Sequence, residues 1–170
     1  MHAKKWNLAH LQLNKTFLFV DDDSAACSAA KRMARLFGVE VQTANSAISA
    51  ISLLEHNPES YFLVLADEVM PGMSGTALLV EVKERWPYIR RALISGAENP
   101  EMLARGFQNA GIFKYIRKPM TDTDIRLLLE QACEEFLTKN VSFKDVVHER
   151  LSVMESTLNA SLKHVSSRAL

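Results

Sequence analysis

Cysteine is scarce in this chain, whose 170 residues include two, Cys27 and Cys133. Two cysteines so far apart make neither a disulfide framework nor a zinc site, so we expect a reducing, cytoplasmic location. Long apolar runs are missing as well. The run 61–66 falls far short of the roughly 20 residues that a membrane helix needs, and residues 1–14 lack the apolar core of a secretory signal. We therefore expect no membrane partner.

An excess of charge of one sign is also absent. Lysine plus arginine number 20 and aspartate plus glutamate number 20, so the formal net charge is zero. Because proteins whose main function is to bind nucleic acid need a basic face, we expect no direct nucleic-acid binding. With 48% apolar and 24% charged residues, the composition is that of a globular protein and excludes a disordered or collagen-like one. The length suits one domain with an appendage.

What the sequence does contain is an alternation of short apolar runs with longer segments of helical spacing. Several runs are almost unbroken apolar stretches, as expected for strands buried on both faces. Such alternation predicts an α/β fold, a doubly wound five-stranded parallel sheet with helices on both faces. The predicted strands are 16–20, 39–43, 61–66, 91–94 and 112–116, and the predicted helices are 24–37, 45–55, 75–85, 99–109 and 121–137.

Polar residues follow four of the predicted strands. An acidic triplet, 21–23, follows the first strand, Asp67 the third, Ser95 the fourth and Lys118 the fifth. Because an open parallel sheet binds its ligand at the carboxyl ends of its strands, we expect these groups to meet. Gathered carboxylates repel one another unless a hard cation such as Mg²⁺ joins them, and a lysine suits a phosphate. The set therefore predicts a phosphoryl pocket in which a carboxylate can act as nucleophile.

Four motifs in this order resemble those of receiver domains from bacterial two-component response regulators. They are VDDD at 20–23, DEVMPGMSG at 67–75, ISG at 94–96 and YIRKP at 115–119. The resemblance covers about residues 15–137 and implies the flavodoxin-like strand order 2-1-3-4-5. It makes residues 1–14 an N-terminal extension and residues 138–170 a C-terminal helical extension.

The resemblance also implies a chemistry for the acidic pocket. Asp67 would accept a phosphoryl group from a phosphohistidine of a sensor histidine kinase or a phosphotransfer protein. Beyond this self-phosphotransfer and self-dephosphorylation, the domain would not be an enzyme. Mg²⁺ would be the cofactor, with Asp22, Asp67 and the backbone carbonyl of Val69 as ligands and Asp21 acting through water.

The remaining motif residues would sense the phosphoryl group. By the resemblance, Lys118 contacts the phosphoryl oxygens, and the Lys118–Pro119 peptide is cis. Ser95 hydrogen-bonds the phosphate, and Tyr115 changes position in response. The switched face would then alter contacts with a downstream effector protein or with an output domain of a longer regulator.

Beyond the receiver-like region, apolar residues recur every three or four positions on one predicted helix face. This helix would pair with its copy in a homodimer through 142–166, the outcome we favour, or fold back on its own domain. It would otherwise serve as a connector to an effector. The apolar residues are Phe143, Val147, Leu151, Met154, Leu158 and Leu162.

Two other functions remain open at this point. The run 21–25 partly matches the Asp-x-Asp-x-Thr/Val signature of haloacid-dehalogenase-like phosphatases, in which Asp21 would be the nucleophile. Ala25 replaces the Thr or Val of that signature, and the motif that begins at Asp67 is then left unexplained. A receiver-like scaffold that is never phosphorylated is the second alternative.

Overall fold

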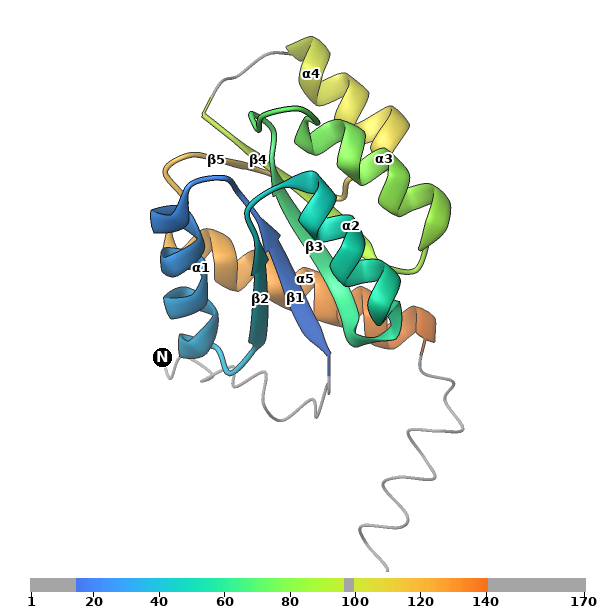
Figure 1. The fold of residues 1–170 in the computed structure, drawn as a ribbon. Coiled ribbons are helices and arrows are strands. Elements are labelled where there is room, and N and C mark those ends of the chain that lie inside the picture. Colours follow the sequence, from blue (N-terminus) through green and yellow to red (C-terminus); the bar gives the residue numbers. More distant parts are fainter. Residues whose placement is uncertain (1–14, 97–99, 141–170) are drawn as a thin grey trace, which may run out of the picture. The chain divides into compact units, whose positions relative to one another are not determined.

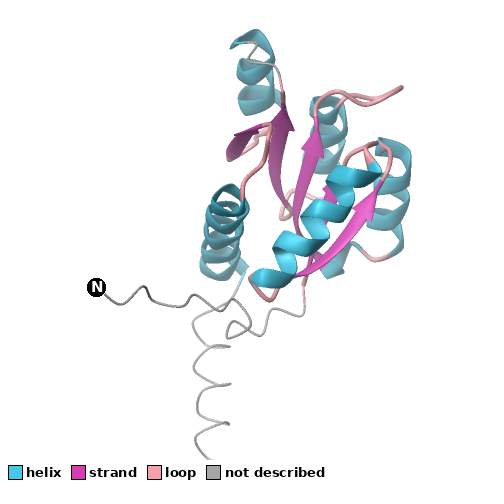
Figure 2. Ribbon diagram, turned by 90° about the vertical axis from the view of Figure 1, so that its left-hand side faces the viewer, coloured by secondary structure: helices cyan, strands magenta, loops and turns pink. Residues whose placement is uncertain are grey.

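A parallel sheet of five strands, in the order β2-β1-β3-β4-β5, forms the centre of the computed structural model, which describes residues 15–96 and 100–140 (Figure 1). Helices lie on both sides of the sheet (Figure 2). The predicted doubly wound fold and its strand order are confirmed. The strands are β1 (Thr16–Val20), β2 (Glu40–Ala44), β3 (Tyr61–Asp67), β4 (Arg90–Ser95) and β5 (Lys114–Arg117).

The α-helices alternate with the strands as the sequence predicts. They are α1 (Ser24–Leu36), α2 (Ala47–His56), α3 (Gly75–Arg85), α4 (Pro100–Arg105) and α5 (Asp122–Asn140). A 3₁₀ turn, η2 (Pro58–Ser60), precedes β3, and a π-helical turn, η3 (Gly106–Ala110), follows α4. None of the helices in the described ranges has the length and apolarity to cross a membrane. The predicted dimerisation segment 142–166 lies outside the described residues.

The core occupies both faces of the central strands because successive side chains of a strand point to opposite sides. On β1, Leu18 and Val20 belong to a buried cluster with apolar residues of α2 and α3. Phe19, between them, lines a cavity with residues of α1 instead. All seven residues of β3 are buried. This double burial explains why β1 and β3 read as continuous apolar runs in the sequence.

Helix starts are fixed by side chains that cap them. Asp23 accepts a hydrogen bond from the Ala25 amide at the start of α1. Ser46 and Ser49 form a reciprocal capping box, so α2 begins at Ala47 rather than at the predicted residue 45.

The predicted helix 99–109 is wrong in its second half. The structure has α4 as far as Arg105 and then the π-helical turn η3. Gly106 is buried, and an added Cβ would lie 3.0 Å from the Ile112 side chain. Ile112 joins the core cluster instead of starting a strand, so β5 begins two residues later than predicted, at Lys114.

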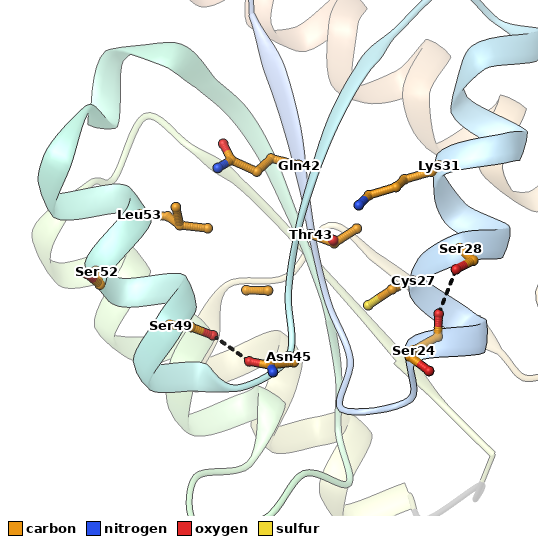
Figure 3. Close-up of a pocket in the computed structure, with 11 residues that line it drawn as sticks. Ser24, Cys27, Ser28, Lys31, Gln42, Thr43, Asn45, Ser49, Ser52 and Leu53 are labelled. Atoms are coloured by element: carbon orange, nitrogen blue, oxygen red, sulfur yellow. Dashed lines mark hydrogen bonds between the residues drawn. The ribbon is translucent and has the colours of Figure 1, made fainter.

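The edge strand β2 borders a cavity of about 650 Å³ between α1 and α2 (Figure 3). Cys27 on α1 lines this cavity, and its Sγ–H donates to the Asp21 carbonyl. Lys31 is the one charged side chain in the lining, which holds no carboxylate. This cavity is therefore separate from the acidic residues that follow β1 and β3.

Candidate functional site

Three carboxylates meet at the carboxyl end of the sheet. In the parallel pairing of β1 with β3, Val20 lies opposite Ala66, so the next residues along the two chains, Asp21 and Asp67, come at the same level. One ligand oxygen from each of Asp21, Asp22 and Asp67 falls within 4.8 Å of the others. Asp21 and Asp67 are buried, at 1% and 4% exposure, while Asp22 faces solvent. The predicted convergence of these side chains is therefore present.

Lys118 supplies the positive charge of this cluster. Its Nζ lies 2.9 Å from Asp21 Oδ2 and 3.1 Å from Asp67 Oδ1. The peptide between Lys118 and Pro119 is cis, and the Lys118 amide donates to the Ser95 carbonyl at 2.9 Å. The lysine thus reaches the carboxylates from the end of β5, although it is far from them in sequence.

Burial and the ion pairs move the pKa values of these groups. Burial raises the pKa of the Asp67 carboxyl above its ordinary value of 3.8, and the hydrogen bond and charge of Lys118 only partly oppose this. Burial alone would lower the pKa of Lys118, but hydrogen bonds to Asp21 and Asp67 outweigh it and keep that pKa raised. Ionised Asp67 is therefore an unfavourable state that an added cation would stabilise.

Asp67 should make the stability of the Mg²⁺-free domain depend on pH. The folded state keeps the Asp67 proton to higher pH than the unfolded chain, so this residue's contribution falls as pH rises from about 3.8 through the folded-state pKa. We expect Asp67→Asn to raise Tm by a few degrees at pH 7 and by less toward acid pH. Thermal unfolding of both proteins in EDTA, between about pH 4 and 8, measures this. An advantage that grows toward acid would contradict it.

The residues predicted to sense a phosphoryl group lie beside the cluster. Ser95 is fully buried at the end of β4. The Tyr115 hydroxyl donates to the Ser95 carbonyl at 3.2 Å, and its ring packs against the core cluster. Val69, whose backbone carbonyl the resemblance predicts as a ligand, lies in the loop after β3 and is 71% exposed. The sensing and ligand roles of these residues stay predictions.

Sequence reasoning missed a set of contacts that hold the loop between β3 and α3. Glu68 Oε2 accepts hydrogen bonds from the amide and the hydroxyl of Thr76, at 2.8 and 2.7 Å. The Gly75 amide donates to the Glu68 carbonyl at 3.2 Å. The cap of α1 was not missed, because the sequence offers Asp23 or Ser24 for this role; Asp23 fills it, and its amide donates to Asp21 Oδ1. The sequence signal that could have indicated these contacts is the presence of polar residues, Glu68 and Thr76, at the two ends of the β3–α3 loop.

The cluster fits a magnesium ion. Its three carboxylates offer the hard oxygen donors that Mg²⁺ prefers. The exposure of Asp22 leaves room for the waters that this ion retains. Two buried carboxylates share a single ammonium group, so a further positive charge is electrostatically favourable there.

A second cavity, of about 560 Å³, adjoins the acidic cluster. Asp21, Asp23 and Lys118 line one part of it. Apolar side chains line the rest: Phe19, Ala25, Ala26, Ala29, Met33, Ile94, Pro119 and Met120. A molecule that reaches the carboxylates from this side therefore contacts α1 and the segment after β5.

Comparison with known proteins places these features in a family context. The model of the response regulator receiver domain matches residues 17–130. The chain is 39% identical over 120 residues to the hydrogenase transcriptional regulatory protein HoxA of Cupriavidus necator, covering 70% of this chain and 24% of that protein. It is 33% identical over 147 residues to the two-component response regulator ORR27 of Oryza sativa subsp. japonica, covering 86% and 21%. The chain thus spans about a quarter of the length of these relatives.

Solved structures show the same architecture. A response regulator receiver domain protein (CheY-like) from Methanospirillum hungatei JF-1 matches with a TM-score of 0.69 and 28% identity, covering 74% of this chain and 98% of that one. The signal receiver domain of an HD domain-containing protein from Pseudomonas fluorescens Pf-5 has a TM-score of 0.70 at 24% identity, with coverage of 74% and 98%. The second match supports the fold alone.

Proposed function

The chain belongs to the family of response regulator receiver domains, and from this premise we propose that Asp67 is its phospho-acceptor. The observation that carries the proposal is the placement of the Asp67 carboxylate, buried at a strand end, 3.1 Å from the Lys118 ammonium and beside two further carboxylates. A carboxylate in such a site can form an acyl phosphate. The phosphoryl donor is a phosphohistidine of a sensor histidine kinase or a phosphotransfer protein.

The transfer forms a P–O bond and breaks a P–N bond. An Asp67 oxygen attacks phosphorus, the new P–O bond forms as the P–N bond breaks, and the electron pair of that bond leaves with the donor imidazole. Lys118 stabilises the negative charge on the transferring oxygens. When bound, Mg²⁺ supplies further charge neutralisation, and Asp21, Asp22, Asp67 and the Val69 carbonyl would hold it.

The donor approaches along the 560 Å³ cavity beside the acidic cluster. Its apolar lining on α1 includes Ala26 and Ala29, and Pro119 and Met120 face them from the segment after β5. Apolar side chains that flank the donor histidine can be buried in this cavity while the phosphoryl group meets Asp67. This combination of an apolar lining with an acidic end supports a protein donor.

Phosphorylation then changes a neighbouring face of the domain. The acyl phosphate adds nearly two negative charges and new acceptor oxygens. Ser95 donates a hydrogen bond to it, and Tyr115 gives up its present bond to the Ser95 carbonyl. A coupling of about 1–3 kcal/mol suffices to alter partner affinity by roughly 5- to 150-fold.

The wider function follows from this switch. The domain acts in the cytoplasm as a phosphorylated signalling protein of a two-component system. Its target is a downstream effector protein or an output domain of a longer regulator, without direct nucleic-acid binding by this chain. We propose that this chain pairs with a second copy of itself through the predicted dimerisation segment 142–166, which lies outside the described residues. Apart from self-phosphotransfer and self-dephosphorylation, the domain catalyses no reaction.

A mass measurement tests the central claim. After incubation with phosphoramidate and Mg²⁺, we expect the intact protein to gain the mass of one phosphoryl group. Asp67→Asn should abolish this gain because the amide cannot form an acyl phosphate. Omission of Mg²⁺ should reduce it strongly. An adduct that persists in Asp67→Asn would refute the role of Asp67.

The two alternatives have less support. Both carboxylate oxygens of Asp21 are already engaged, one by Lys118 and the other by the Asp23 amide, and the side chain is buried. Turnover of p-nitrophenyl phosphate that is lost in Asp21→Asn would favour the phosphatase. Failure to bind Mg²⁺ or beryllofluoride would favour the scaffold that is never phosphorylated.

A further inference from the structure

The loop between β3 and α3 is closed at its base by Glu68 and two neighbouring residues of the α3 start. The Glu68 amide still donates to the Ile94 carbonyl at 2.9 Å, so the backbone keeps the sheet register up to this residue. Its carbonyl accepts from the Gly75 amide, and its carboxylate accepts from the amide and hydroxyl of Thr76. Glu68 therefore anchors both ends of the segment 69–74, through its carboxylate and through its own backbone amide and carbonyl.

The Glu68 carboxylate accepts hydrogen bonds from the start of α3 and is not part of the acidic cluster. It is half-buried, and it does not belong to the carboxylate group formed by Asp21, Asp22 and Asp67. It lies at the amino end of an 11-residue helix, where a negative charge is favoured. The bonds of 2.7 and 2.8 Å have the short length of charge-assisted hydrogen bonds. Thr76 thus gives the Glu68 carboxylate a hydrogen-bond partner outside the acidic cluster.

The helix already has another cap. The Ser74 side chain accepts from the Ala77 amide at 3.2 Å, which is the ordinary arrangement for a helix start. A second acceptor from the end of β3 is not needed to begin α3. What the Glu68–Thr76 contact adds is a connection between the residue after Asp67 and the far end of the loop.

We propose that Glu68 and Thr76 are positioning residues that fix the β3–α3 loop so that the Val69 carbonyl can act as a ligand for Mg²⁺. The proposal rests on the function proposed above, because it concerns the same site. Neither side chain touches the ion or the phosphoryl group. They act through the backbone of residues 69–74, whose anchored ends limit the movement of that carbonyl.

The test compares Mg²⁺ affinity in three variants by isothermal titration calorimetry. Thr76→Val removes the hydroxyl donor and keeps a branched side chain of similar size, and we expect the Kd for Mg²⁺ to rise about three- to tenfold. Thr76→Ser keeps the hydroxyl and should bind nearly as the wild type does. Ser74→Ala removes the other cap of α3 without touching Glu68, and it should leave the Kd unchanged although it lowers Tm.

Each result decides between positioning and mere helix capping. Equal weakening in Ser74→Ala and Thr76→Val, or no weakening in Thr76→Val, would overturn the proposal. If Thr76→Val does not fold, Thr76→Ala decides the same question, because it also removes the hydroxyl donor to Glu68 and leaves every charge near the acidic cluster in place. Calorimetry requires no phosphoryl group. A wild type that binds Mg²⁺ but gains no phosphoryl mass would therefore refute the proposed function while this comparison still stands.

Discussion

Gly75→Ala is expected to destabilise the domain by about 3 kcal/mol and to impair phosphoryl acceptance at Asp67. A Cβ at this position would lie 2.2 Å from the Asp67 carbonyl oxygen and 2.8 Å from its carbonyl carbon. Both are backbone atoms of β3, so no side-chain rotation can relieve the clash. The start of α3 must move away, which breaks the bond from the Gly75 amide to the Glu68 carbonyl. The better helix propensity of alanine offsets only about 1 kcal/mol.

Urea unfolding followed by circular dichroism measures the loss, and two other glycines provide matched controls. Gly96→Ala should be nearly neutral, since nothing lies within 4 Å of its added Cβ. Gly72→Ala also has open space, but its φ of +82° is unfavourable for alanine and should cost about 1 kcal/mol. A Gly75→Ala protein within 0.5 kcal/mol of the wild type would show that the loop yields easily, and would weaken the positioning proposal too.

The meeting of Asp67 with Lys118 could be predicted from sequence because it depends only on topology. Once the alternation of strands and helices indicates a parallel sheet, every strand carboxyl end lies at one edge, and the residue after each strand is known. The burial of β1 and β3 on both faces made their bounds easy to read. The backbone topology alone brings these residues together, whatever conformations their side chains adopt.

Features that depend on tertiary packing could not be predicted in the same way. The π-helical turn η3 is one such feature, because the helical spacing of 99–109 contains no sign of it. In the folded protein Gly106 is buried, and an added Cβ would lie 3.0 Å from the Ile112 side chain. The sequence placed Lys118 beside Asp67, but the second ion pair of this lysine, to Asp21 Oδ2 at 2.9 Å, is seen only in the structure. The hydrogen bonds between Thr76 and Glu68 require the β3–α3 loop to bring its two ends together, and only the folded backbone specifies this.

Lys118→Met is expected to have the largest effect on chemistry. The variant keeps an apolar stem of similar length but leaves Asp21 and Asp67, both buried, without their shared ammonium group. Loss of one preorganised charge at a reacting centre costs about 100- to 1,000-fold in rate, so we expect a decrease of this order in phosphorylation by phosphoramidate. The time course of the mass gain at saturating Mg²⁺ measures it. Lys31→Met, which removes an exposed lysine of α1, should react as the wild type does.

The same substitution should make stability depend on Mg²⁺. Breaking a fully buried ion pair costs about 3–5 kcal/mol, but the Lys118 side chain is 34% exposed, so we expect about 2 kcal/mol in EDTA. Bound Mg²⁺ should restore more stability to Lys118→Met than it adds to the wild type, because it replaces the missing positive charge. Adding Asp67→Asn to Lys118→Met should recover stability in EDTA, since the remaining Asp21 then faces a neutral neighbour. A double variant less stable than Lys118→Met would show that repulsion between these carboxylates does not govern the site.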